Sequence, residues 1–211
     1  MAGLVAAIAI LILSSGCSTS FKYTPAHENS YLLSTNRLGL AITTGQDLRP
    51  DNAIRPDWTR NAESIVSHAL ADEAKHAKMF RRVGIHADSA ASTKYSEIVR
   101  FRIVKFEIRN QSGFLESAGK EILRYKGFRG GLIADSIPTK YISEVEIEFE
   151  VLDAATQRSL FRKSYAATRE DKFNGYQNET LKIRLTSAAL ESVITDFVKD
   201  LAKPPASPKT L

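Results

Sequence analysis

Three residues of metal-ligating type have the spacing of one helix face. His68, Asp72 and His76 are four residues apart, and side chains at that spacing project from the same side of a helix. Two imidazoles and a carboxylate suit zinc, although a complete site needs a further element to supply the remaining ligand. The solvent face of an amphipathic helix carries the same residue types without any metal. We therefore keep these residues as a candidate metal site only, and we predict no resident metal and no other cofactor.

Nucleophilic and phosphate-binding chemistry finds little support in the sequence. No Gly-x-Ser-x-Gly turn occurs, which is the arrangement that exposes the nucleophile of many serine hydrolases. The glycine-rich run Gly127–Gly131 lacks the Lys-Ser/Thr ending of a phosphate-binding loop. We predict that the protein is not an enzyme and has no catalytic residues.

The single cysteine, Cys17, follows a short apolar leader. Residues 1–16 carry no charge, and their apolar run from Leu4 to Leu13 is too short to cross a ~30 Å hydrocarbon core at ~1.5 Å per residue. Small residues then precede Cys17, as they do at the cleavage site of a signal peptide. The pattern predicts a signal peptide over residues 1–16. The alternatives are a secretory signal beside an incidental cysteine, or a buried N-terminal helix.

This junction resembles the lipobox of bacterial lipoproteins, in which the cysteine is acylated and the peptide before it is removed. The resemblance implies a membrane anchor of palmitate-like chains on Cys17, and each chain adds ~0.8 kcal/mol of membrane affinity per buried CH₂. Ser18, rather than an aspartate, follows the cysteine. The resemblance therefore implies the bacterial outer membrane, with the protein facing the periplasm.

Residues 110–140 interleave basic with aromatic side chains. The basic residues are Lys120, Arg124, Lys126 and Arg129, in a chain of net charge +5. In a cytosolic protein this pattern would suggest nucleic acid, but behind a signal peptide the available polyanions are lipid headgroups, lipopolysaccharide and peptidoglycan. We expect a long excursion without regular structure that binds an envelope protein, lipopolysaccharide or peptidoglycan, and no nucleic acid. The alternative is a surface loop with incidental charge.

The loop after the first predicted strand contains Asp47-Leu48-Arg49. A structural role is sufficient for these residues, with Asp47 capping the turn and Arg49 paired with Asp47 or with Asp51. A partner-binding role for Asp47 and Arg49 is the alternative.

The hydrophobic pattern predicts two helices and one sheet. Apolar residues recur at three- and four-residue steps over 60–78 and 180–202, which indicates amphipathic helices. Strands are predicted over residues 37–44, 79–86, 98–109, 144–151 and 158–168, with a β-bulge at 103–104 where the alternation slips. The fold class is therefore α+β: a two-layer sandwich with a mainly antiparallel sheet of about 4–5 strands and two long helices on one face.

Two of these strands predict their own pairing. Glutamates at 144, 146, 148 and 150 alternate with apolar residues, which is typical of a strand with one solvated face. Pairing residue 152 with residue 158 places Phe149 opposite Phe161 and Glu148 opposite Arg162, so one register suits both faces of the hairpin.

The order of these elements, with the Asp47-x-Arg49 loop, resembles the YajG-like family of bacterial lipoproteins, whose fold is similar to the amino-terminal domain of the translocation protein TolB. The resemblance implies no activity, cofactor or substrate. We predict an acylated tether over residues 17–36, one domain over 37–202 and a Pro-rich tail over 203–211. The expected function is a non-catalytic binding or assembly module for a cell-envelope component. The alternative is a carrier lipoprotein for a small ligand or a metal.

Acylation of Cys17 is directly testable. Labelled palmitate should be incorporated into the wild-type protein and not into a Cys17→Ser variant, because the chain holds no other thiol. Equal labelling of the two proteins would remove the anchor from the prediction.

Overall fold

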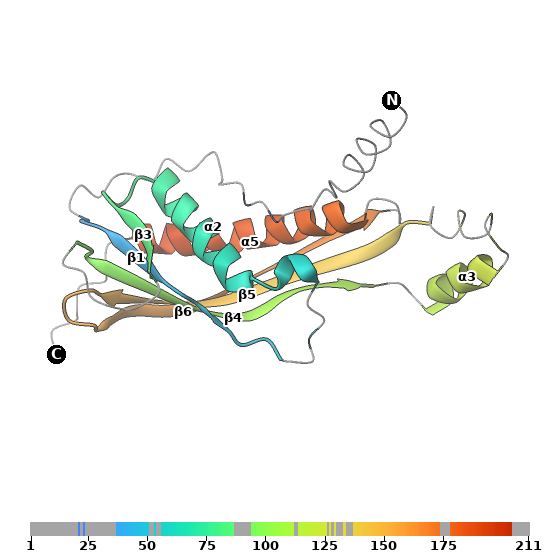
Figure 1. The fold of residues 1–211 in the computed structure, drawn as a ribbon, viewed down its shortest axis with the longest axis horizontal. Coiled ribbons are helices and arrows are strands. Elements are labelled where there is room, and N and C mark those ends of the chain that lie inside the picture. The colour runs from blue at the N-terminus through green and yellow to red at the C-terminus, as the bar shows by residue number, and fades with distance from the viewer. Residues whose placement is uncertain are drawn as a thin grey trace, which may run out of the picture.

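The computed structural model describes residues 21, 23, 37–50, 53, 56–86, 94–111, 114–125, 127, 129, 133, 137–173 and 178–203. The predicted signal peptide, Cys17 and most of the predicted tether and tail lie outside the described residues, as does Lys126. Figure 1 shows the arrangement of the described elements, in which the helices α2 and α5 lie along one side of a long sheet.

The sheet contains the strand order β3-β1-β4-β5-β6, and a short strand β2 also pairs with β4. The strands are β1 (Leu40–Thr43), β2 (Gln46–Asp47), β3 (Val83–His86), β4 (Glu97–Asn110), β5 (Thr139–Asp153) and β6 (Ser159–Phe173). The three long strands form an antiparallel meander, which confirms the mainly antiparallel sheet. β1 pairs in parallel with both β3 and β4. The parallel pairing with β3 is possible because the chain crosses over through α2 before it returns as β3.

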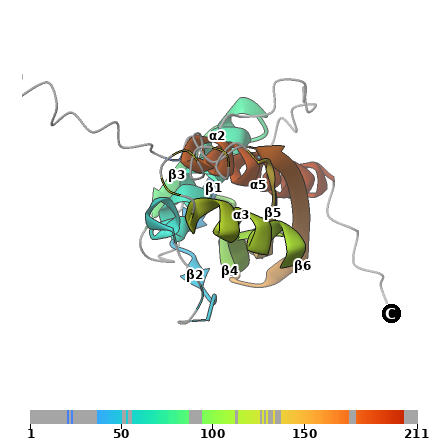
Figure 2. The same ribbon diagram turned by 90° about the vertical axis from the view of Figure 1, so that its right-hand side faces the viewer.

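Two helices cover one face of this sheet, as predicted. They are α2 (Ala62–His76) and α5 (Asn178–Ala202), and a short 3₁₀ helix, η1 (Asp57–Thr59), precedes α2. The view along the sheet in Figure 2 places α2 and α5 together on one side of β4, β5 and β6. The ring of Phe197 on α5 stacks on that of Phe149 on β5, with centroids 4.1 Å apart. The two-layer α+β architecture is therefore confirmed.

β1 is buried on both faces, as its unbroken apolar sequence predicted. Leu40 and Ile42 are fully buried, and Ala41 on the other face is 7% exposed. The strand is shorter than expected and begins at Leu40 rather than residue 37. β3 also begins later than predicted, at Val83, because Met79 and Phe80 are buried in the turn that follows α2.

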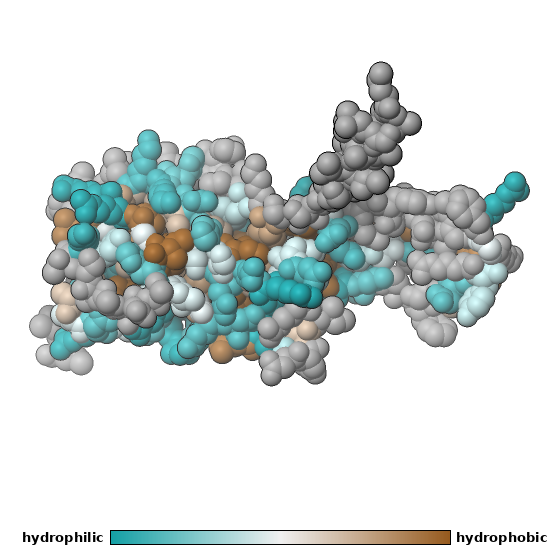
Figure 3. All heavy atoms as spheres, in the orientation of Figure 1, coloured by the Kyte–Doolittle hydropathy of each residue, from teal (hydrophilic) through white to brown (hydrophobic). Residues whose placement is uncertain are grey.

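The outer face of the sheet is a solvated array of ion pairs. Glu148 of β5 contacts Arg102 of β4 (3.4 Å) and Arg162 of β6 (2.7 Å). Glu144 contacts Arg109 of β4 at 2.7 Å. Exposed pairs of this kind add little stability. Their effect is to keep this face of the sheet hydrated, so that it does not bind apolar surfaces. The molecular surface in Figure 3 has hydrophilic residues around several small hydrophobic patches.

The predicted β-bulge is confirmed at the predicted place. Ile103 pairs with Ile147, and Lys105 pairs with Glu146. Val104 is the extra residue, and its side chain is 38% exposed. The bulge therefore returns Phe106 to the covered face, where it is fully buried.

The predicted register of the β5–β6 hairpin is wrong by two residues. Val151 pairs with Phe161, and Phe149 pairs with Lys163. The turn is one residue longer than expected, because Leu152 pairs with Ser159 and not with residue 158, and the ladder shifts again beside Val151. The Asp153 carboxylate holds this turn by accepting hydrogen bonds from the backbone N–H and the hydroxyl of Thr156. A shift of two residues keeps each side chain on its predicted face, so the Arg162–Glu148 contact survives as a diagonal pair.

Residues 110–140 also differ from their prediction, because they contain regular structure. A helix, α3 (Phe114–Tyr125), follows β4. Figure 1 shows α3 beyond the ends of β4 and β5, apart from α2 and α5.

The contact of α5 with β6 predicts an acid-sensitive stability. Asp200 of α5 accepts hydrogen bonds from Lys163 Nζ (2.6 Å), Lys203 Nζ (2.6 Å) and the Tyr165 hydroxyl (2.8 Å). Chiefly the bond from Lys163, then those from Lys203 and Tyr165, hold the pKa of Asp200 well below its ordinary value. The contribution to stability is complete above the unfolded-state pKa of ~4, and it is lost as the pH falls toward the lower folded-state pKa.

We expect Asp200→Asn to lower the free energy of unfolding at pH 7 by about 1–2 kcal/mol, since the hydrogen bonds to the charged carboxylate are lost. Urea denaturation at pH 7 and at pH 3 measures the effect. The variant and the wild type should differ less at the lower pH, and an undiminished difference would contradict the assignment.

Candidate functional site

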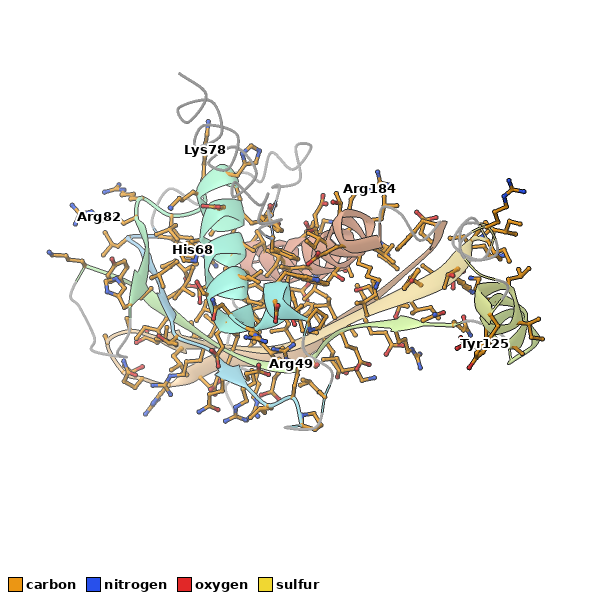
Figure 4. All side chains as sticks on the ribbon, turned by 45° about the vertical axis from the view of Figure 1, so that its right-hand side comes forward. Arg49, His68, Lys78, Arg82, Tyr125 and Arg184 are labelled. Atoms are coloured by element: carbon orange, nitrogen blue, oxygen red, sulfur yellow. The ribbon has the colours of Figure 1, made fainter. Side chains whose placement is uncertain are left out.

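α3 carries two large apolar side chains on its solvent side, Ile122 and Tyr125. Ala118, Ile122 and Tyr125 are four and three residues apart, so they lie on one face of the helix. Ile122 is 62% exposed and Tyr125 is 87% exposed. Figure 4 shows Tyr125 on α3, far from the covered side of the sheet. The helix ends there, and Gly127 then adopts a left-handed backbone conformation with φ of 79°, which commonly terminates helices.

The opposite face of α3 is held by the sheet. Lys120 is half-buried and donates a hydrogen bond to the hydroxyl of Thr139, the first residue of β5. Leu123 on the same side is also half-buried. Helices of globular proteins normally direct their apolar face inward, so α3 is oriented the opposite way.

The four basic residues predicted to bind a partner are not equivalent. Lys120 is engaged with Thr139, whereas Arg129 is exposed. The side chain of Arg124 and the whole of Lys126 lie outside the described residues. The apolar face formed by Ile122 and Tyr125 was missed by sequence reasoning, and a helical-period test over residues 114–125 would have found it.

Arg49 is at the centre of a buried polar cluster. Its Nε and Nη2 donate to the two carboxylate oxygens of Asp47, at 2.9 and 2.6 Å. Its Nη1 donates to the carbonyl of Phe106 on β4, and its Nη2 donates to the carbonyl of Thr59 in η1, both at 3.0 Å. Arg49 is 5% exposed and lies within the fold in Figure 4.

The Arg49 cluster therefore joins the loop after β2 to both η1 and β4. The sequence predicted that Arg49 pairs with either Asp47 or Asp51, and in the structure it pairs with Asp47. The geometry supports the structural role, because the buried guanidinium already donates four hydrogen bonds, to Asp47 and to two backbone carbonyls. The partner-binding role of Asp47 and Arg49 stays a prediction.

A groove of about 580 Å³ lies on the outer side of α2. His68 and Asp72 line it together with three aromatic side chains from other segments, Phe21, Tyr23 and Trp58. His76 is not among its lining residues, and His68 Nδ1 lies 2.7 Å from the carbonyl of Ser64. Within the described part of the chain, no group of three His, Cys, Asp or Glu side chains is placed to hold a metal ion.

The N-terminal segment packs on the wall of this groove. Phe21 stacks on Trp58 with ring centroids 6.2 Å apart, and the Tyr23 hydroxyl donates to buried Glu73 of α2 at 2.9 Å. Burial first, and then the charge of Glu73, raises the pKa of Tyr23 well above its ordinary value. These two residues of the predicted tether therefore lie against the domain.

The fold and the site together define a two-layer α+β domain with a projecting amphipathic helix. No family model and no curated protein matches the sequence. The chain is similar in fold to a Xanthomonas campestris protein of the family DUF330 (10% identity, TM-score 0.52), over 87% of this chain and 92% of that one.

Two further solved structures are less similar. A Chlamydia trachomatis protein has 8% identity and a TM-score of 0.49, over 79% of this chain and 96% of that one. A minor lipoprotein from Acinetobacter baumannii has 10% identity and a TM-score of 0.39, over 79% and 93%. These similarities concern the fold alone, so the resemblance to the YajG-like lipoproteins and to TolB stays a prediction.

The buried cluster predicts a large effect for Arg49. We expect Arg49→Met to lower the free energy of unfolding by about 3 kcal/mol, because Asp47 and two buried carbonyls lose their donor. Thermal and urea denaturation measure the loss. The control is Arg60→Met, since Arg60 pairs with Asp57 at 2.6 Å but is 71% exposed, and its change should stay within about 0.5 kcal/mol. Equal losses in the two variants would refute the structural role of Arg49.

Proposed function

We propose that this chain is a non-catalytic bacterial lipoprotein that is anchored in the outer membrane through acylated Cys17, faces the periplasm and binds another component of the cell envelope. The anchor is supported by the sequence around Cys17. Among the described residues, no helix is long and apolar enough to cross a membrane.

The observation that carries the binding role is the exposed apolar face of α3. Apolar surface left in water costs ~25 cal/mol per Å², and clustered exposure of this kind marks interaction sites. Ile122 and Tyr125 are the two most exposed of the large apolar side chains that the structure describes. Because α3 stands apart from α2 and α5 (Figure 1), a partner can reach this face without disturbing the core.

Crosslinking in intact envelopes tests this role. A diazirine crosslinker captures protein, lipopolysaccharide and phospholipid alike, so it makes no assumption about the partner. We expect Ile122→Asp and a deletion of residues 113–131 to reduce at least one crosslinked species more than fivefold. The control is Leu160→Asp, because Leu160 on β6 is also exposed, at 45%. An unchanged set of species in both test variants would exclude α3 as the contact.

The groove beside α2 favours a second candidate function, a carrier of a small ligand. Its aromatic and polar lining resembles that of small-molecule sites, and Trp58, the only tryptophan in the chain, reports on its occupancy. Titration with zinc, followed by calorimetry and Trp58 fluorescence, tests the metal form of this candidate. Heat of zinc binding that disappears in His68→Ala would support this candidate function. Absence of binding heat in the wild type would exclude its metal form.

A further inference from the structure

We propose that α3 lies on the surface of a bilayer with anionic headgroups, with Ile122, Tyr125 and Ile133 in the interfacial layer. This inference rests on the proposed function and names its envelope component as lipid.

The first support is the concentration of exposed apolar side chains at one end of the molecule. Ile122, Tyr125 and Ile133 are 62%, 87% and 54% exposed. The other large exposed apolar side chains in the described chain, such as Leu48, Leu160 and Ile85, lie outside α3 and are less exposed than Ile122. Tyrosine suits the interface between water and lipid, because its ring is apolar and its hydroxyl can remain hydrated.

The second support is charge. Residues 120–133 carry four basic residues, Lys120, Arg124, Lys126 and Arg129, against one acidic residue, Glu121. Arg129 is exposed. Basic residues beside an amphipathic helix attract anionic lipid, and the attraction weakens as salt screens it. An apolar groove on a partner protein would not attract this excess of positive charge, whereas anionic headgroups would. Exposed apolar and basic residues together therefore favour a lipid surface.

The third support is that a contact with the sheet fixes the rotation of α3 about its own axis. Lys120 donates to Thr139 at the start of β5, and this contact directs the opposite face outward. At ~1.5 Å per residue, the 12 residues of α3 extend about 18 Å. A helix of that length lies within the interface rather than across the bilayer.

The position of the anchor brings lipid within reach. Cys17 precedes Phe21 by four residues, which is about 14 Å at full extension, and Phe21 contacts Phe106 of β4 at a centroid distance of 6.0 Å. From Phe106, β4 continues for four residues, about 13 Å, before the chain enters α3. An acyl anchor on Cys17 therefore keeps the bilayer close to the strand that carries α3.

The experiment uses the full-length acylated protein in vesicles of phosphatidylglycerol and phosphatidylcholine that contain brominated acyl chains. Trp58→Phe removes the native indole, and Ile122→Trp places a new one on α3. Leu160→Trp, in the same background, is the control for an exposed apolar site elsewhere. Bromine quenches an indole only at short range, so the readout is depth in the bilayer rather than attachment to the vesicle.

We expect at least threefold stronger quenching for Ile122→Trp than for Leu160→Trp, reduced to half or less in Arg129→Glu and in pure phosphatidylcholine. Equal quenching at the two positions would overturn the inference. So would a fluorescence shift of the Ile122→Trp protein that depends on protein concentration without vesicles, because a second copy would then cover α3.

This result is distinguishable from failure of the proposed function. If Cys17→Ser releases the protein from envelopes and α3 variants still alter the crosslinked species, the lipoprotein and its binding role stand. Absence of quenching in that case would show that α3 contacts a macromolecule other than lipid.

Discussion

The structure depends on the burial of one face of the β4–β5–β6 meander under α5. The stack of Phe149 on Phe197, at 4.1 Å, is at the centre of this contact, and Tyr165 of β6 packs edge-on against Phe197. Because close packing of apolar side chains holds the centre of this contact, every long strand must present its apolar residues on the same side. The bulge at Val104 serves that condition, since it returns Phe106 to the covered face.

Charge is organised around this covered face. On the outer side, the glutamates of β5 pair with cations of β4 and β6 in solvent. At the rim of the covered layer, Arg49 is the exception that is buried, and it remains satisfied because Asp47 and two backbone carbonyls accept all of its described bonds. Burial of an unpaired guanidinium would be costly. The loop after β2, η1 and β4 are therefore held together as one unit against which Phe21 and α2 pack.

The candidate site lies where this organisation ends. β4 and β5 continue beyond the helical layer and carry α3 at their far end (Figure 1). α3 lies apart from the core, and the side that carries Lys120 and Leu123 faces the sheet, where Lys120 donates a hydrogen bond to Thr139. An apolar helix face in this position is explained by a surface outside the molecule. The proposed anchor on Cys17 and the docking of Phe21 place such a surface, the lipid bilayer, nearby.

The sequence by itself determined the class of fold, both long helices, the bulge and the solvated glutamate face, because these follow from local periodicity of apolar residues. It also contained the cysteine on which localisation is proposed, but Cys17 lies outside the described residues. Only the tertiary structure decided the β5–β6 register, the parallel pairing of β1, the burial of Arg49 and the outward apolar face of α3. Each of these depends on contacts between residues far apart in the chain. A helical period shows that a helix has an apolar face, whereas the packing of the whole domain decides whether that face is covered.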